Sequence, residues 1–226
     1  MSRNLQVNNN KTEEHVIRRN GPEEWKQCKY LGTLLSTEED IKRRKQLANA
    51  AFTQYKTILT SKNIELKVRL RLFNALISSV FLYNSELWTL TKTQIKNIDA
   101  FQRNLLRKIL NIHWPYIISN DKLHEITSEI VDPWSMTIKM RRLSWLGHLY
   151  RLPENTPARQ ALMESLKPAK KPRGRPTKTW NSMINEDLKE LGLKLGDEEL
   201  TETTQDRLVW KTIILGGAVP NNGEKR

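Results

Sequence analysis

The chain has 226 residues with 38 Lys and Arg against 25 Asp and Glu, a formal net charge of +13 that favours polyanionic partners such as DNA or RNA. No apolar run approaches the ~18 residues that a membrane span needs, and the polar N-terminus is no signal peptide, so we expect neither membrane insertion nor secretion. Cys28 is the only cysteine, which excludes an internal disulfide and a cysteine-based zinc site and suits a nuclear or cytoplasmic location, with the nucleus favoured.

The N-terminal part predicts little regular structure. Residues 1–24 are polar and contain Gly21-Pro22, which predicts a flexible lead-in. Residues 25–36 contain an apolar run, Lys29 to Leu35, that is rich in β-formers. This run predicts a short strand or hairpin arm that cannot support a sheet alone.

Residues 37–112 predict a three-helix bundle. Thr37 precedes three acids and is the expected N-cap of a helix that runs to about residue 59. A second helix is expected over 64–83, and a third runs from Thr91 or Thr93 to about residue 112. Short connections favour antiparallel neighbours. In the second helix, the side chains expected to face inward are Val68, Leu72, Ala75, Leu76, Ser79 and Val80.

The remaining chain predicts further helices around a basic linker, so the expected fold class is mainly α. Residues 113–166 form a helical region, with helices near 121–128 and from Pro133 to about residue 151. Residues 167–178 form the basic linker, 179–215 hold the last helices, and 216–226 predict a disordered tail.

The positive charge is concentrated in one stretch. Residues 141–178 carry ten Lys or Arg and two acids, whereas residues 179–226 carry six basic residues and nine acids. The basic stretch and the start of the first helix are therefore the expected contact regions. The predicted nucleic-acid-binding residues are Lys42, Arg43, Arg44, Lys45, Arg141, Arg142, Arg151, Lys170, Lys171, Arg173, Arg175 and Lys178.

Two segments of this stretch have alternative interpretations. Pro172-Arg173-Gly174-Arg175-Pro176 has the core of an AT-hook, which inserts into the minor groove of A·T-rich DNA, but a disordered cationic linker explains it equally well. In 141–151, Trp145 lies among cations and could stack on bases. The alternative packs Trp145 in the core and leaves the arginines in solvent, and a mixture of the two is also open.

The sequence offers no recognisable catalytic or metal site. The four histidines are scattered without metal-ligand spacing, and no paired aspartates suggest a two-metal centre. Cys28 has no histidine near it in sequence, and a lone acid such as Glu86 is more often a cap or an ion-pair partner than a catalyst. We expect no catalytic residue, no metal and no cofactor.

Four segments in order resemble the C-terminal part of non-LTR (LINE-type) retrotransposon endonuclease–reverse transcriptases, over about residues 25–192. They are Lys29-Tyr30-Leu31-Gly32, Leu82-Tyr83-Asn84-Ser85-Glu86-Leu87-Trp88, Arg142-Leu143-Ser144-Trp145-Leu146-Gly147-His148, and Arg173-Gly174-Arg175-Pro176 with Trp180. The resemblance implies that Tyr30, Leu31 and Gly32 mark the junction of palm and thumb, and that Tyr83, Glu86 and Trp88 are thumb scaffold. Trp145, Gly147, His148 and Trp180 would belong to the region beyond the thumb.

The chain departs from the family pattern in several places. The family usually has Gly where this chain has Asn84, and a basic residue where it has Thr177. The aromatic-Ala-Asp-Asp motif of the polymerase palm and the endonuclease domain are absent. The resemblance therefore implies a non-catalytic fragment that holds a template–primer or RNA–DNA duplex. The alternatives are an AT-hook chromatin adaptor, whose helical bundle binds a protein partner, and a pseudogene product without a selected function.

Overall fold

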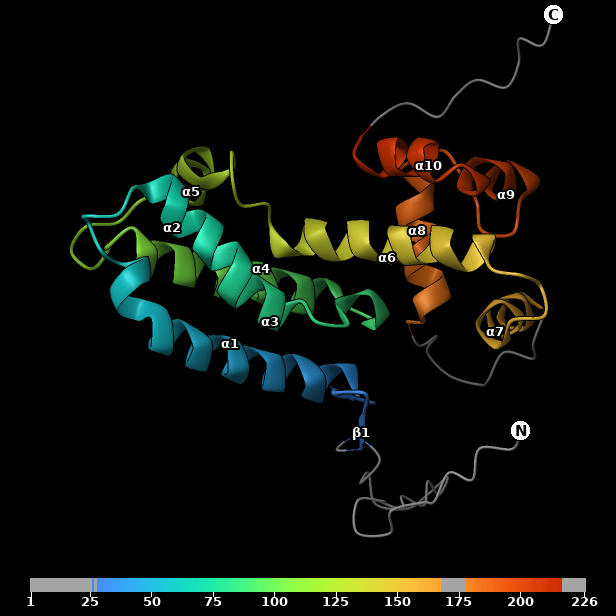
Figure 1. The fold of residues 1–226 in the computed structure, drawn as a ribbon, viewed down its shortest axis with the longest axis horizontal. Coiled ribbons are helices and arrows are strands. Elements are labelled where there is room, and N and C mark those ends of the chain that lie inside the picture. Colours follow the sequence, from blue (N-terminus) through green and yellow to red (C-terminus); the bar gives the residue numbers. More distant parts are fainter. Residues whose placement is uncertain (1–25, 27, 168–177, 217–226) are drawn as a thin grey trace, which may run out of the picture.

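The computed structural model describes residue 26 and residues 28–167 and 178–216, and it confirms a mainly helical fold with a short two-stranded antiparallel sheet near the N-terminus (Figure 1). The first elements are β1 (Lys29–Tyr30), β2 (Thr33–Leu34), α1 (Thr37–Leu59), α2 (Leu66–Phe73), the π-helical η3 (Asn74–Ser78), α3 (Ser79–Phe81), the 3₁₀ helix η4 (Ser85–Leu87) and α4 (Lys92–Ile109). They are followed by α5 (Asn120–Thr127), α6 (Trp134–Arg151), α7 (Pro157–Leu166), α8 (Trp180–Lys189), α9 (Glu198–Gln205) and α10 (Arg207–Ile214).

Side-chain caps start the two long helices of the N-terminal half. The cap of α1 is Ser36 and not the expected Thr37, since the Ser36 hydroxyl accepts from the backbone N–H of Glu39 at 3.5 Å. Thr91 caps α4 as expected, in a capping box with Gln94. The expected boundary was one residue off at α1 because two adjacent hydroxyl residues offer the same chemistry.

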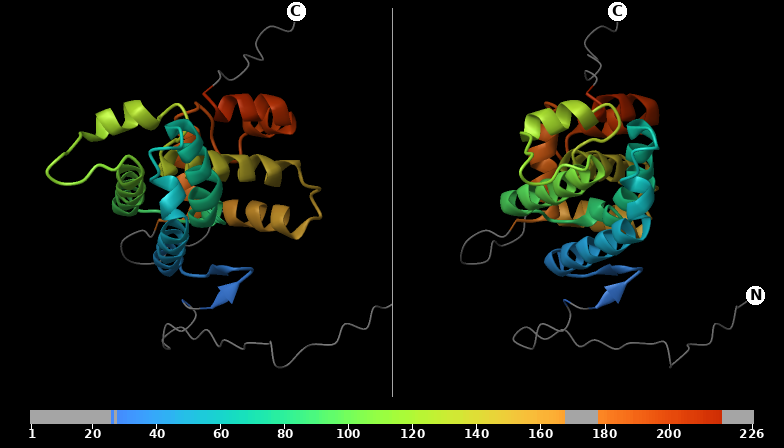
Figure 2. Two further views of the ribbon diagram at one scale, coloured as in Figure 1. Left: turned by 60° about the vertical axis from the view of Figure 1, so that its left-hand side comes forward. Right: turned by 90° about the vertical axis from the view of Figure 1, so that its left-hand side faces the viewer.

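A tight hairpin precedes α1. Its two central residues, Leu31 and Gly32, have φ of 46° and 81°, the positive values that two-residue hairpin turns require. Glycine adopts this backbone without a steric cost, whereas leucine does so at a cost. Figure 2 shows the hairpin projecting from the N-terminal end of α1.

The first hydrophobic core gathers α1, α2, η3, α3 and α4, and it also takes in the start of α6. The rings of Phe81 and Trp134 stack face to face with centroids 4.2 Å apart. The Phe73 ring is also stacked with Trp134, at 5.9 Å between centroids. Met183 of α8 reaches this core too, and its sulfur accepts from the Leu90 N–H. Helices α6 and α8 thus contribute to this core, although they lie beyond the three-helix bundle expected over residues 37–112. The predicted domain boundaries stay a prediction.

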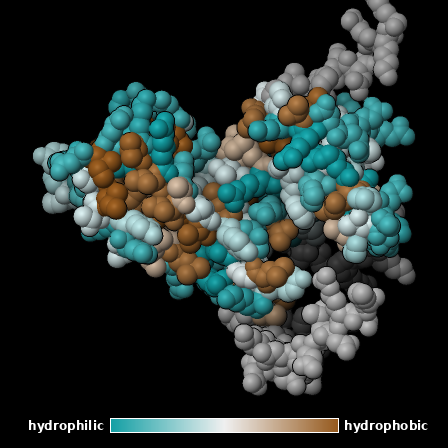
Figure 3. Space-filling model, in the orientation of Figure 1, coloured by the Kyte–Doolittle hydropathy of each residue, from teal (hydrophilic) through white to brown (hydrophobic). Residues whose placement is uncertain are grey.

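The inward face expected for the second helix was wrong in part. Leu72 and Leu76 pack against the core, but Val68, Ala75 and Ser79 are exposed. The side chains that α2, η3 and α3 bury are Leu70, Phe73, Ile77 and Phe81, whereas Val68 is 41% exposed. Both sets of residues have helical spacing, and the set with two phenylalanines is buried because the larger rings remove more apolar area from water. Apolar side chains consequently gather on the outer surface of α2 and α3 (Figure 3). The expected protein contact through the bundle stays a prediction.

The helix α6 connects two cores. Its first half carries Trp134 and Ile138 into the first core, and its second half carries Leu143, Leu146 and Leu149 into a second core with α7, α8, α9 and α10. Figure 1 shows α6 running through the middle of the molecule, with α8 crossing it and α10 beside it. The sequence interpretation did not include α7 and α9. No helix in the described ranges is long and apolar enough to cross a membrane.

Candidate nucleic-acid interface

The residues between α3 and α4 form a turn, here called the 82–88 turn, on which the family-like segments converge. The Tyr83 hydroxyl donates to the Leu31 carbonyl at 3.0 Å, and the Asn84 amide donates to the Thr33 hydroxyl at 3.2 Å. Asn84 has φ of 56°, so this chain places a residue that tolerates left-handed backbone where the family usually has Gly. The hairpin is thus held by the turn and not by a larger sheet.

Asp40 connects the hairpin, α1 and the 82–88 turn. Its buried carboxylate accepts from the Leu34 N–H at 3.1 Å and from the Trp88 indole N–H at 2.9 Å. Arg44 is buried beside it, donates to the Gly32 carbonyl and lies 4.5 Å above the Tyr83 ring. Trp88 is accordingly a core residue, and its assignment to a thumb scaffold stays a prediction.

The later segments reach the same turn from the other side. Arg141 of α6 donates to the Leu82 carbonyl, and the Trp180 indole N–H donates to the Glu86 carbonyl at 2.9 Å. Segments separated by more than a hundred residues are therefore joined by hydrogen bonds around one turn. Leu31, Arg141 and Trp180 thus all bond to this one turn, while residues 173–176 lie outside the described part of the chain.

Beside this junction, α6 and α10 enclose a groove that we call the basic groove. Its volume is about 380 Å³, and its cations are Arg141, Arg151, Arg207 and Lys211. No carboxylate lines it, and in the described part of the chain none of these four cations forms an ion pair. The rest of the lining is mostly apolar and consists of Thr137, Met140, Ser144, Trp210, Ile214 and Leu215.

The absence of a side chain at Gly147 lets α10 approach α6. A Cβ at Gly147 would lie 2.3 Å from two atoms of the Trp210 indole ring. The same indole donates to the Leu143 carbonyl at 2.9 Å, and Arg151 donates to the Thr204 carbonyl at 2.8 Å. Gly147 is therefore required by packing, and the close approach of α10 creates the basic groove.

The predicted contact residues at the start of α1 are only partly available. Lys42 is exposed but pairs with Glu38 and Glu39, and Arg43 donates to the Gly32 carbonyl. Lys45 is half-buried, 5.6 Å from the Phe101 ring centre, and burial lowers its pKa. Arg44, as described, is a packing residue.

On α6 the predicted arginines have different environments. Arg142 is buried in an ion pair with Asp187 of α8, at 2.7 Å from Nη2 to Oδ2. Arg141 and Arg151 are half-buried and line the basic groove, while His148 is exposed and Trp145 half-buried. The interpretations of this segment stay predictions: Trp145 is half-buried, one arginine lies inside and two lie at the surface.

The helices on either side of the basic linker, α7 and α8, are bonded to each other. The Asn181 amide of α8 donates to the backbone and side-chain oxygens of Ser165 of α7, at 3.2 and 2.9 Å. Lys178, at the end of the linker, pairs with Glu186 at 2.9 Å. Lys170, Lys171, Arg173 and Arg175 lie outside the described residues.

Arg207 and Lys211 were missed by the sequence interpretation. They lie in a region with more acids than bases, so a count of charge along the chain pointed away from them. Their spacing of four residues places both on one face of a helix, and this was the available signal. Packing of α10 against α6 brings them to the arginines of the basic stretch.

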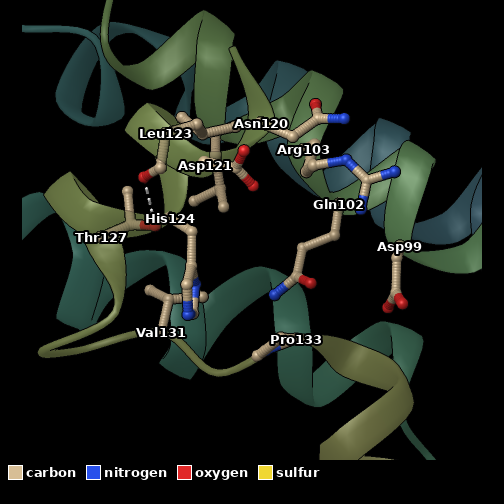
Figure 4. A pocket seen from close by; sticks show the side chains of 11 residues that line it. Asp99, Gln102, Arg103, Asn120, Asp121, Leu123, His124, Thr127, Val131 and Pro133 are labelled. Atoms are coloured by element: carbon tan, nitrogen blue, oxygen red, sulfur yellow. Dashed lines mark hydrogen bonds between the residues drawn. The ribbon is translucent and has the colours of Figure 1, made fainter.

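A more enclosed cavity of about 220 Å³ lies between α4 and α5, at the start of α6 (Figure 4). Its polar side chains hold α6 in place, since Asp99 accepts from the Ser135 N–H and hydroxyl and Gln102 accepts from the Trp134 N–H. Within the described ranges no three His, Cys, Asp or Glu side chains are grouped to hold a metal ion. We therefore assign this cavity a structural role.

Comparison with known proteins gives one informative match. A putative uncharacterized transposon-derived protein of Caenorhabditis elegans is 26% identical to this chain over 198 residues, which covers 82% of this chain and 68% of that protein. No family model and no solved structure matches the chain. The similarity supports a transposon origin for the chain.

Proposed function

We propose that the chain is a non-catalytic nucleic-acid-binding fragment derived from the thumb and post-thumb region of a non-LTR retrotransposon reverse transcriptase. The transposon-derived relative supports the origin. The contacts around the 82–88 turn support the finer assignment, because Leu31 and Trp180 of the resembling segments bond to it and Arg141, directly before the third segment, does so too. The polymerase palm motif is absent from the sequence.

The observation that carries the proposed binding is the basic groove. Its four cations have no acidic partners in the described chain, so phosphate groups would be their counterions. Binding of phosphates to such cations releases condensed ions from the nucleic acid and is therefore strongly dependent on salt. From Arg141 to Arg151 the stripe on α6 extends about 15 Å, the length of roughly four base pairs of duplex.

The test measures binding of the full chain to matched duplex DNA, duplex RNA and RNA–DNA hybrid. Fluorescence anisotropy reports the binding at each of several salt concentrations. A fragment that holds a template–primer should bind the hybrid at least as tightly as either duplex. The variant Arg207→Gln with Lys211→Gln should weaken binding and lower the salt slope by about two, one for each lost phosphate contact.

The matched control removes the same charge elsewhere. Lys62 and Lys96 are exposed, lie outside the basic groove and form no ion pair in the described chain. Lys62→Gln with Lys96→Gln should change the slope much less than the groove variant. Equal effects of the two pairs would show that only net charge matters, and no binding at all would contradict the proposal.

The proposed absence of catalysis has its own test. Purified chain should give no product in primer extension on an RNA template with Mg²⁺ and all four deoxynucleotides. Extension that persists through further purification would contradict this part of the proposal.

A further inference from the structure

A shallow hollow of about 320 Å³ lies next to the basic groove, between η4 and α6. It is lined by Glu86, Arg141, Ser144, Trp145 and His148. Arg141 and Ser144 line the basic groove as well, so the two sites share a wall. The hollow thus combines two aromatic rings, a cation, a hydroxyl and a carboxylate in a space the size of one nucleotide.

Trp145 provides an aromatic ring whose indole N–H has no acceptor among the described residues. The indole N–H groups of Trp88, Trp134, Trp180 and Trp210 all donate to oxygen atoms within the protein. The indole N–H of Trp145 donates to no atom of the described residues, although the side chain is half-buried. Its ring lies beside the His148 ring, with centroids 5.1 Å apart and planes inclined by 38°. Such rings can stack on a base.

Glu86 is the unexpected member of the site. Its backbone carbonyl accepts from Trp180, but its carboxylate forms no hydrogen bond or ion pair with the described residues. The residue is half-buried in a turn that Trp88 and Asp40 fix in place. A carboxylate repels phosphate, so it does not serve a surface that binds only the backbone. It can accept hydrogen bonds from N–H groups.

We propose that this hollow binds one unpaired nucleobase of a strand held along α6, with guanine preferred. This inference rests on the proposed function. Guanine presents two adjacent donors, N1–H and N2–H₂, on one edge, and these match the two oxygens of the Glu86 carboxylate. The base lies against Trp145 and His148, and Arg141 contacts the adjoining phosphate.

The experiment compares labelled eight-nucleotide dT strands that carry dG, dA, dC or dT at one central position, at fixed salt. We expect the dG strand to bind roughly tenfold more tightly than the dT strand, the scale of one good bidentate contact. Glu86→Gln should remove this preference, because the amide offers one acceptor and one donor group. Glu154→Gln is the matched control, since Glu154 is exposed and outside the hollow, and it should keep the preference.

A second measurement locates the base directly on the unmodified chain. A dT strand with one central 6-thio-dG is irradiated with near-ultraviolet light and the complex is digested with trypsin. The cross-link should fall in the peptide of residues 143–151, which contains Trp145 and His148. This readout does not depend on whether the Glu86 variant folds.

The two proposals fail in different ways. Equal binding of all four strands, or a cross-link that falls elsewhere, would overturn the base-binding hollow and leave the basic groove intact. A dG preference that survives Glu86→Gln would also overturn it. If the unmodified chain bound none of the nucleic acids, the proposed function itself would be overturned.

Discussion

Gly147 and Trp210 are in direct contact across the interface of α6 and α10, and a single added Cβ would overlap the indole ring at 2.3 Å. Both residues are buried, and the indole is held by its hydrogen bond to Leu143. The basic groove therefore depends on a residue that carries no functional group.

Gly147→Ala should destabilise the chain by about 3 kcal/mol, because overpacking forces either α10 or the Trp210 ring to move. Urea unfolding followed by circular dichroism measures this cost. In a Trp210→Leu background the same substitution should cost much less, since the overlapping ring is gone. An equal cost in both backgrounds would show that the Cβ does not meet the indole.

Arg142→Met should lower the free energy of unfolding by about 3–5 kcal/mol, because it leaves Asp187 buried without its partner. The double variant with Asp187→Leu should recover most of this loss. Denaturant unfolding of the three proteins provides the measurement. If Arg142→Met left stability intact but lowered the salt slope of binding, Arg142 would be a phosphate contact and not a packing residue.

Asn84→Gly should be within about 0.5 kcal/mol of the natural chain, because glycine adopts the left-handed backbone freely while the bond to Thr33 is lost. Asn84→Ala should cost about 1–2 kcal/mol, since alanine meets the steric penalty of this backbone and also loses the bond. Thermal unfolding of both variants tests the order. A more stable alanine variant would contradict it.

Arg173→Ala with Arg175→Ala tests whether the linker reads sequence or only holds phosphates. We expect weaker binding to A·T-rich and mixed duplexes by the same factor, with a salt slope smaller by about two. Competition between the two duplexes measures the preference. A loss confined to the A·T-rich duplex would favour the AT-hook interpretation.

The sequence predicted the fold class and most helices because caps and helical spacing are local signals. It failed at α2 and α3, where two apolar faces had the same period and only the tertiary neighbours of Phe73 and Phe81 decided which was buried. It also could not separate Arg141 from Arg142. Adjacent residues on a helix point about 100° apart, and the position of Asp187, 45 residues away in the chain, determines which arginine is inside.

The helix α6 sets a limit on how this chain can be divided. A fragment that ends at residue 112 would lack Trp134, which stacks on Phe81, and would lack Ile138 and Met183 as well. The ring surfaces of Phe73, Phe81 and Phe101 that Trp134 covers would be exposed to water. A fragment that begins after α4 would lose the Leu82 carbonyl that holds Arg141 and the turn that holds Trp180. The smallest autonomous folding unit should therefore extend from the hairpin to α8 at least, and shorter pieces should be prone to aggregation.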